Sequence, residues 1–186
     1  QLGRGESVYE TANVLSRFVH GLIVRTYEQK ELEELSQMGS IPVINALTDF
    51  LHPCQTYTDA FSMTERWSDG TNHLESLKGR KMAYFGDTAN NIANSWILGA
   101  AMFGMELVLA GPEGYEPGEE IKQVLAGSGY APTYSVTNDP EAAARDADVL
   151  YTDTWVSMGQ EEESADRIAA MRPFSVTSDL MKLGKS

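Results

Sequence analysis

Arg25 and the segment that follows residue 51 carry side chains suited to binding a small anion. Arg25 comes directly after the apolar run Leu-Ile-Val at residues 22–24. A guanidinium at the end of a strand can donate two parallel hydrogen bonds to a phosphate or a carboxylate. An ordinary surface arginine is the alternative reading of this residue. Arg25 therefore indicates an anion site only in combination with other groups.

A second cluster is His-Pro-Cys-Gln at residues 52–55. Proline suits the first turn of a helix, so His52 and Gln55 would flank a helix start, where free N–H groups and the helix dipole favour anions. A histidine can donate to a carbonyl oxygen, and a glutamine can donate or accept. A plain helix cap is the alternative. Cys54 has no evident activating base, and we expect it to be chemically inert.

The third cluster, residues 86–95, lies between an apolar run and a predicted helix and contains the pair Asn90 and Asn91. It has the position of a nucleotide-binding turn but lacks the Gly-x-Gly-x-x-Gly spacing, which disfavours a dinucleotide. Either asparagine could cap the helix. Their amides could equally hold the amino or carboxylate group of a small ligand.

The fourth cluster is residues 151–161, which include Asp153, Ser157 and Met158. Asp153 ends a predicted strand, and Gly159 permits an irregular backbone before the next helix. An acid, a hydroxyl and exposed backbone groups on one loop could hold the ammonium and carboxylate of an amino acid. Capping of the following helix by Asp153 or Ser157 is the simpler alternative.

Alternating apolar patterns supply the elements that position these clusters. We expect strands at residues 22–24, 41–44, 82–85, 107–110, 134–136, 149–151 and 174–176. We expect helices at residues 6–18, 28–37, 53–67, 91–103, 119–125, 140–145 and 161–171. Strands separated by helices predict an α/β fold with parallel sheets flanked by helices. Ligands of such sheets bind beyond the carboxyl ends of the strands, where the four clusters fall.

The composition excludes several classes of protein. The 186 residues include 14 Lys and Arg against 27 Asp and Glu, a formal net charge of −13. This acidity argues against nucleic acid and against an anionic membrane surface as partners. A single cysteine excludes an internal disulfide and a Cys-rich zinc site, and we expect no metal. No apolar run approaches the ~20 residues of a membrane span.

Beyond these local patterns, residues 52–55 with the preceding residues 42–49 resemble the His-Pro-x-Gln motif of the carbamoyltransferases. Residues 153–161 are similar to the Ser-Met-Gly loop of the ornithine-specific members of that family. Glu6-Ser7 with Thr11-Ala12, and Gly-Tyr-Glu-Pro at residues 114–117, match the same pattern. The similarity covers essentially the whole chain in the same order. Aspartate-specific members share His-Pro-x-Gln but not the Ser-Met-Gly loop.

This resemblance implies a reaction in which the δ-amine of L-ornithine attacks carbamoyl phosphate to give citrulline and phosphate. No cofactor is implied, because no redox step occurs. Other amines, such as putrescine or acetylornithine, and a catalytically dead amino-acid-binding or assembly module remain as alternatives. The family also implies a homotrimer in the cytoplasm.

The resemblance further implies a role for individual residues. Arg25, His52 and Gln55 would be the catalytic residues that bind carbamoyl phosphate, and Gln1 would reach a neighbouring subunit's carbamoyl-phosphate site. The implied ornithine-binding residues are Asn91, Asp153, Ser157 and Met158, the last through its backbone.

Two motifs of the family are absent from the sequence: Ser-x-Arg-Thr-Arg upstream and His-Cys-Leu-Pro downstream. We therefore expect an internal portion of a two-domain architecture whose first domain is incomplete. Residues 1–51 would be the remainder of the carbamoyl-phosphate domain, 52–67 an interdomain helix, and 68–186 an ornithine domain incomplete at its C-terminus. On this reading the isolated chain is inactive and exposes apolar faces of its first two strands.

Overall fold

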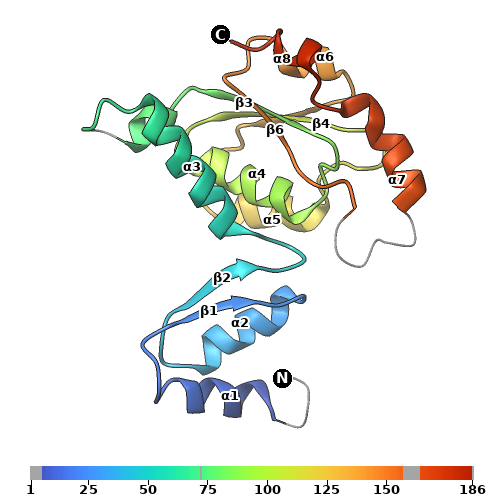
Figure 1. The fold of residues 1–186 in the computed structure, drawn as a ribbon. Helices are drawn as coiled ribbons and strands as arrows, with labels where there is room; N and C mark the ends of the chain where they lie inside the picture. Colours follow the sequence, from blue (N-terminus) through green and yellow to red (C-terminus); the bar gives the residue numbers. More distant parts are fainter. Residues whose placement is uncertain (1–5, 72, 157–163, 186) are drawn as a thin grey trace. The chain divides into compact units, whose positions relative to one another are not determined.

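The computed structural model describes residues 6–71, 73–156 and 164–185. The chain divides into two compact units, Gln1–Gln55 and Thr56–Ser186. Each unit holds its own parallel sheet (Figure 1). The sequence-based expectation of an α/β fold with parallel sheets and flanking helices is therefore confirmed.

Within its described residues, unit 1 is a two-stranded parallel sheet with two helices. In chain order the elements are α1 (Val8–Leu15), β1 (Leu22–Arg25), α2 (Gln29–Met38) and β2 (Val43–Leu47). α1 starts with a capping box: Ser7 Oγ accepts from the Glu10 N–H at 3.2 Å, while the Glu10 carboxylate accepts from the Ser7 N–H at 3.0 Å. Such reciprocal bonds satisfy donors that a helix start otherwise leaves unpaired.

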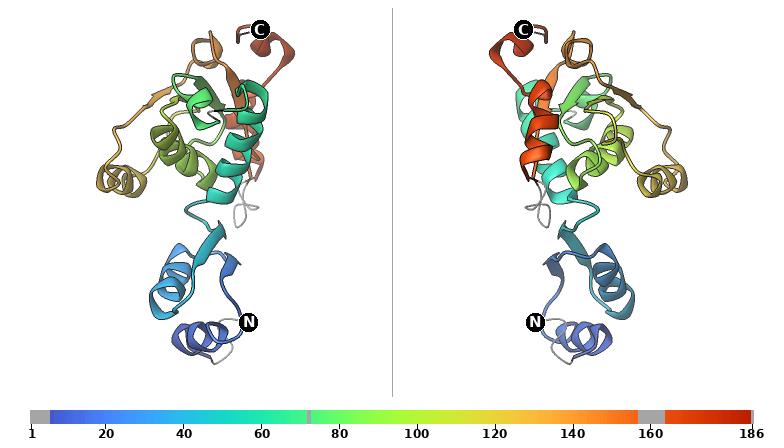
Figure 2. Two further views of the ribbon diagram at one scale, coloured as in Figure 1. Left: turned by 90° about the vertical axis from the view of Figure 1, so that its left-hand side faces the viewer. Right: turned by 90° about the vertical axis from the view of Figure 1, so that its right-hand side faces the viewer.

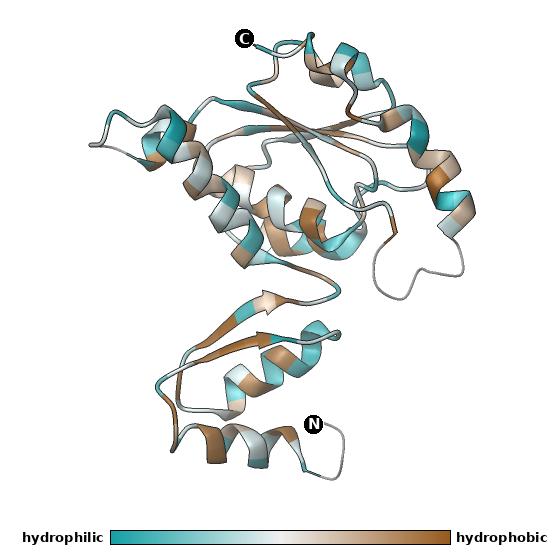
Figure 3. Cartoon of the chain, in the orientation of Figure 1, coloured by the Kyte–Doolittle hydropathy of each residue, from teal (hydrophilic) through white to brown (hydrophobic). Residues whose placement is uncertain are grey.

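The ribbon of β1 is mostly brown in Figure 3 because its residues are apolar, and the burial of these residues alternates along the strand. Leu22 and Val24 are half-buried, whereas Ile23 is 73% exposed and lies opposite Ile44, which is 50% exposed. Side chains alternate between faces along a strand, so Ile23 and Ile44 share one face. An apolar face of the first two strands is thus exposed in this chain, as the sequence predicts.

In its described residues, unit 2 holds a four-stranded parallel sheet in the order β5-β4-β3-β6. The strands are β3 (Lys81–Phe85), β4 (Glu106–Ala110), β5 (Tyr134–Thr137) and β6 (Val149–Thr152). The helices are α3 (Pro53–Trp67, which begins in unit 1), η1 (Leu74–Leu77), α4 (Asn91–Phe103), α5 (Glu119–Gly127), α6 (Pro140–Ala144), α7 (Ser164–Met171), η3 (Arg172–Phe174) and α8 (Ser178–Met181). The chain runs outward from β3 through β4 to β5 and then returns to place β6 on the other side of β3.

Helices cover both faces of this sheet (Figure 1, Figure 2), with α4 and α5 on one face and α6 and α8 on the other. Ala83 and Phe85 of β3 pack with the alanines of α6 and with Leu180 of α8. Met82 and Tyr84 are also fully buried and, by the alternation along a strand, face the opposite side. Because both faces are covered, β3 reads as a continuous apolar run.

The prediction of a strand at residues 174–176 is wrong. The chain forms the short η3 at Arg172–Phe174 and then begins α8 at Ser178. Pro173 lacks an N–H and has a fixed φ suited to the first turn of a helix. Phe174 is buried because its ring joins the cluster beneath α6, with Ala83 and Phe85. Phe174 is thus apolar because its own side chain is buried in the core, and not because it belongs to a strand.

Smaller differences concern the ends of elements. β2 lies at Val43–Leu47 rather than residues 41–44, and α1 is shorter than the expected helix at residues 6–18. The polar stretch at residues 68–79 contains η1, whose Leu77 is fully buried. None of the helices described here has both the length and the apolar character needed to cross a membrane.

Candidate functional site

Arg25 is the last residue of β1 and His52 follows β2, and hydrogen bonds join the segments that leave these two strands. The Thr26 N–H donates to the Leu47 carbonyl at 3.1 Å, and the Asp49 N–H donates to the Tyr27 carbonyl at 2.7 Å. Arg25 is exposed and forms no ion pair with any residue that the structure describes. Its guanidinium is therefore accessible to an anion at the carboxyl end of the small sheet.

Thr48 shapes the turn that leads from β2 to His52. It is fully buried; its N–H donates to the Leu51 carbonyl at 2.8 Å, and its hydroxyl accepts from the Leu51 N–H at 3.0 Å. The same hydroxyl donates to Oε1 of Gln29, at the start of α2, at 2.7 Å. Because one threonine closes the turn and holds it to α2, the position of His52 within unit 1 is well defined.

His52 and Gln55 meet across the first turn of α3. The Gln55 N–H donates to the His52 carbonyl at 3.1 Å and also lies 3.4 Å from Nδ1 of the imidazole. With Nδ1 as the acceptor, the neutral ring carries its proton on Nε2 and can donate from that side. Cys54 is half-buried, and its thiol donates to the Asn45 carbonyl at 3.3 Å. The sulfur is thus part of the packing between α3 and β2.

In unit 2, Asn91 and Asp153 follow the neighbouring strands β3 and β6. Phe85 lies opposite Thr152 in the register of these strands, and the Thr152 hydroxyl donates to the Phe85 carbonyl at 3.0 Å. The order of the strands reverses between β3 and β6, and ligands of open α/β sheets bind at such a switch point. The structure therefore places Asn91 and Asp153 at the edge of the sheet where a ligand is expected.

The two asparagines occupy different positions at the start of α4. Asn90 is the N-cap: its Oδ1 accepts from the Ala93 N–H at 2.8 Å and from the Tyr84 hydroxyl at 3.2 Å. Asn91 is the first helical residue and is half-buried. Asn90 is thus the helix cap, while Asn91 lies at the N-terminus of a helix of 13 residues. The positive end of the helix dipole at this point favours a carboxylate.

Negative charge surrounds the end of β3. Burial, followed by the nearby Asp153 carboxylate, raises the pKa of Tyr84 well above its ordinary value. Burial also raises the pKa of Asp87, against the opposing effects of the Ala89 N–H and the Arg167 guanidinium. Arg167 already supplies a positive charge to Asp87, so Asp153 is the carboxylate here that suits the α-ammonium of a ligand.

Arg167 is a member of this region that sequence reasoning missed. It lies on α7 and forms a buried ion pair with Asp87, 80 positions earlier in the chain. Two signals point to it: an acid at the end of a buried strand requires a cation, and Arg167 lies one helical turn before the apolar Met171. Arg167 and Met171 are the buried residues of α7.

Three predicted site residues, Gln1, Ser157 and Met158, lie outside the described residues. Across the part of the chain that is described, no three His, Cys, Asp or Glu side chains are grouped to hold a metal ion.

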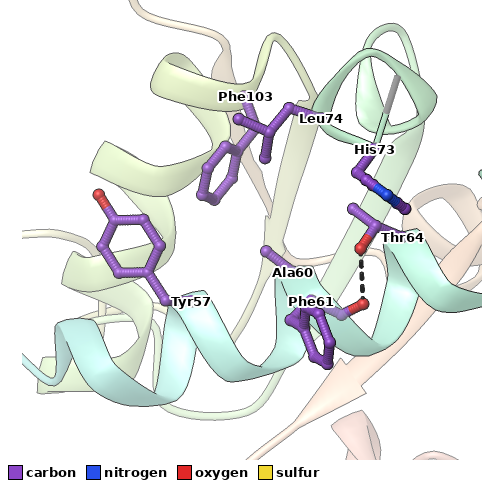
Figure 4. A pocket seen from close by; sticks show the side chains of 7 residues that line it. All are labelled: Tyr57, Ala60, Phe61, Thr64, His73, Leu74 and Phe103. Atoms are coloured by element: carbon purple, nitrogen blue, oxygen red, sulfur yellow. Dashed lines mark hydrogen bonds between the residues drawn. The ribbon is translucent and has the colours of Figure 1, made fainter. Parts of the chain in front are cut away.

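A pocket of about 270 Å³ in unit 2 has a different chemistry (Figure 4). The rings of Tyr57, Phe61 and Phe103 and the side chain of Leu74 line it, and Tyr57 meets Phe103 edge to face at 5.8 Å. None of the described residues that line it carries a carboxylate or a guanidinium. An amino acid with charged ends fits the strand ends better than this pocket.

Comparison with known proteins assigns both units to one family. Residues 1–65 match the family model of the aspartate/ornithine carbamoyltransferase carbamoyl-P binding domain, and residues 78–186 match that of the Asp/Orn binding domain.

Individual relatives carry a more specific name. A protein of Methanoculleus marisnigri named ornithine carbamoyltransferase is 44% identical over 97% of this chain and 55% of its own length. A protein of Pyrococcus furiosus named ornithine carbamoyltransferase, anabolic, is 43% identical over 100% of this chain and 57% of its own length. The solved structure of ornithine carbamoyltransferase from Pyrococcus furiosus superposes with a TM-score of 0.84, covering 100% of this chain and 57% of that one. The chain thus spans little more than half the length of the relatives it matches.

Proposed function

The chain belongs to the aspartate/ornithine carbamoyltransferase family, and we propose that the full-length protein transfers a carbamoyl group from carbamoyl phosphate to the δ-amine of L-ornithine. The observation that carries the proposal is the position of Asn91 and Asp153 at the switch point between β3 and β6. An amide at a helix start and a carboxylate suit the two charged groups on the α-carbon of an amino acid.

In this proposal unit 1 binds carbamoyl phosphate. Arg25, exposed at the end of β1, donates to the phosphate and to the carbonyl oxygen. His52 donates from Nε2 to the same carbonyl oxygen and stabilises the negative charge that develops there. Gln55 holds the carbamoyl amide. Gln1 is assigned to the carbamoyl-phosphate site of a neighbouring subunit.

Asp153 and Asn91 bind the α-ammonium and α-carboxylate of ornithine, together with Ser157 and the backbone of Met158. Binding of these two groups orients the δ-amine toward the carbonyl carbon of carbamoyl phosphate. Such positioning supplies a large part of the rate enhancement. The neutral amine forms the new C–N bond, the C–O bond to phosphate breaks, and the proton lost by the amine passes to the released phosphate or to solvent.

We further propose how the protein is organised into domains and subunits. Residues 1–51 belong to the carbamoyl-phosphate domain, 52–67 form an interdomain helix, and 68–186 belong to the ornithine domain. The protein is a cytoplasmic homotrimer, and its direction is biosynthetic, as the name of the Pyrococcus furiosus relative suggests. Sedimentation of the full-length protein tests the trimer.

A citrulline assay tests the proposed activity. The protein encoded by the complete reading frame is supplied with carbamoyl phosphate and L-ornithine, and citrulline and phosphate are measured together. Equal amounts of both products support the proposal. Binding of ornithine without any citrulline would instead indicate a dead binding module, and phosphate release without citrulline would mean that water is the acceptor.

A further inference from the structure

Arg167 and Asp87 form an ion pair in the interior of unit 2, where their residues are only 7% and 4% exposed. A buried ion pair is poor evidence for stability, because removing two charges from water offsets most of their attraction. In some proteins such a pair instead fixes one arrangement of the segments it joins. The segments joined here are the loop after β3, which leads to Asn91 at the start of α4, and helix α7.

The guanidinium of Arg167 also contacts two other loops at the carboxyl edge of the sheet. Its Nε donates to the Trp155 carbonyl at 3.2 Å, two residues beyond Asp153. Its Cζ lies over the ring of Tyr115, a residue of the loop after β4, at 5.1 Å from the ring centre. One side chain thus joins the loops that follow β3, β4 and β6.

Besides their contacts with Arg167, these loops form further contacts within and between themselves. Asp87 Oδ1 accepts from the Ala89 N–H at 2.9 Å, and the Thr88 hydroxyl donates to the Tyr115 carbonyl at 2.5 Å. The Trp155 indole lies against Gly86, where an added Cβ would come within 3.0 Å of Nε1. Trp155 is therefore held at its carbonyl by Arg167 and at its ring by the end of β3.

We propose that Arg167 is a positioning residue of the amino-acid site: it holds the loop that carries Asp153 against the loop that leads to Asn91. This inference rests on the proposed function, because it assigns both residues to ornithine. Arg167 acts through the two loops and does not touch the substrate. Its role follows from the planar guanidinium, which presents donors to Asp87 and to Trp155 at the same time.

Arg80 provides a matched control at the opposite edge of the same two strands. It pairs with Asp148 at 2.9 Å, so this Arg–Asp pair joins the amino ends of β3 and β6. Asp148 also accepts from the Lys81 N–H at 2.9 Å. Loss of Arg80 weakens the same sheet without reaching the loops at its carboxyl edge.

The test compares Arg167→Ala with Arg80→Ala in the full-length protein. Arg167→Ala should raise the KM for ornithine by about tenfold or more, since small displacements of substrate-binding groups are costly, and should leave the KM for carbamoyl phosphate unchanged. Arg80→Ala should lower the melting temperature while leaving both KM values unchanged. An Arg167→Ala variant with the ornithine KM of the parent would overturn the proposal.

Amide hydrogen exchange gives a readout that does not depend on activity. Arg167→Ala should speed exchange in peptides covering residues 86–90 and 153–156, and Arg80→Ala should not. Arg167→Lys retains the charge beside Asp87 without the planar fork, and should speed exchange at 153–156 even if the alanine variant does not fold. Equal exchange in the Arg167 and Arg80 variants would contradict the assigned role. A parent protein that makes no citrulline would refute the proposed function alone, because the exchange data still decide the role of Arg167.

Discussion

The Tyr151 hydroxyl donates a hydrogen bond of 2.7 Å to Oδ2 of Asp59, which joins the middle of α3 to the strand that leads to Asp153. The Tyr151 ring stacks on Tyr84 at 5.5 Å and meets Trp96 edge-on at 5.9 Å. Burial, together with the Asp59 carboxylate, raises the pKa of Tyr151 above the ordinary tyrosine value of about 10, so the hydroxyl remains a donor in alkaline solution as well as at neutral pH. Within unit 2, α3 is thus held to the sheet by a polar contact beside an aromatic cluster.

Removing this hydroxyl should weaken the attachment of α3. We expect Tyr151→Phe to lower the free energy of unfolding by about 1.5–3 kcal/mol, the range for a hydrogen bond to a charged partner. Urea unfolding followed by circular dichroism measures the change. Tyr130→Phe is the control, because the Tyr130 residue is 47% exposed. An equal effect of the two substitutions would show that the bond to Asp59 contributes nothing.

Arg25→Ala should weaken both binding and turnover of carbamoyl phosphate, because the proposed contacts reach the phosphate and the carbonyl oxygen together. Steady-state kinetics with carbamoyl phosphate as the varied substrate measure both effects. Arg17, an exposed arginine in the same unit, is the matched control, and Arg17→Ala should have the kinetics of the parent. Unchanged kcat and KM in Arg25→Ala would remove Arg25 from the site.

His52→Ala should lower kcat by about 100-fold or more, the usual scale for losing one donor to a developing oxyanion. The expected cause is the loss of the Nε2 donor, since Nδ1 already faces the Gln55 N–H. The ornithine KM should change little. Retention of most of the parent's kcat would exclude His52 from stabilising charge on the carbonyl oxygen.

Asp148 should contribute stability that depends on pH. Burial alone would raise the pKa of this carboxyl group, but hydrogen bonds from Lys185, the Lys81 N–H and Arg80 outweigh burial and lower it. An acid with a lowered pKa stabilises the fold above its unfolded pKa of about 3.9, and that stabilisation disappears as the pH falls through the folded pKa. The destabilisation by Asp148→Asn should therefore be full at pH 7 and shrink below about pH 4.

Urea midpoints of the parent and Asp148→Asn, measured from pH 7 downward, follow this loss. The exposed Asp179, which pairs with Lys182, is the control, and Asp179→Asn should show little effect at any pH. A deficit in Asp148→Asn that stays constant with pH would show that the ionised carboxylate is not the source of the stability.

Local patterns were sufficient to predict much of this fold. The strands at β1, β3 and β4 are short apolar runs bounded by polar or glycine residues, and such runs predict buried strands. The N-cap at Asp139 and the helix stop at Gly104, which adopts a positive φ of 68°, follow from the same local rules. These features depend on neighbours in the sequence.

Features that depend on distant partners escaped the sequence analysis. The sequence around Phe174 predicts a strand because the pattern of a buried aromatic residue is the same in a strand and in a short helical turn. Arg167 resembles a surface residue of an amphipathic helix until its partner Asp87 is known. The sequence places Asp87 only within the loop at residues 86–95, whereas in the structure its carboxylate is buried. Such pairings arise because α7 brings Arg167 to the loops at the carboxyl edge of the sheet, which no local pattern encodes.

We expect Asp153 to bind the α-ammonium of L-ornithine. The decisive measurement is kcat/KM for L-ornithine, N-acetylornithine and putrescine, in the full-length protein and in Asp153→Asn. Ornithine should be the preferred amine of the parent. Asp153→Asn should lower kcat/KM for ornithine by roughly ten- to a hundredfold, the value of a charge-assisted hydrogen bond. The KM for carbamoyl phosphate should not change, and N-acetylornithine, which lacks the ammonium, should be affected much less. A parent enzyme that prefers putrescine or N-acetylornithine, or an Asp153→Asn variant that uses ornithine as well as the parent does, would exclude this role of Asp153.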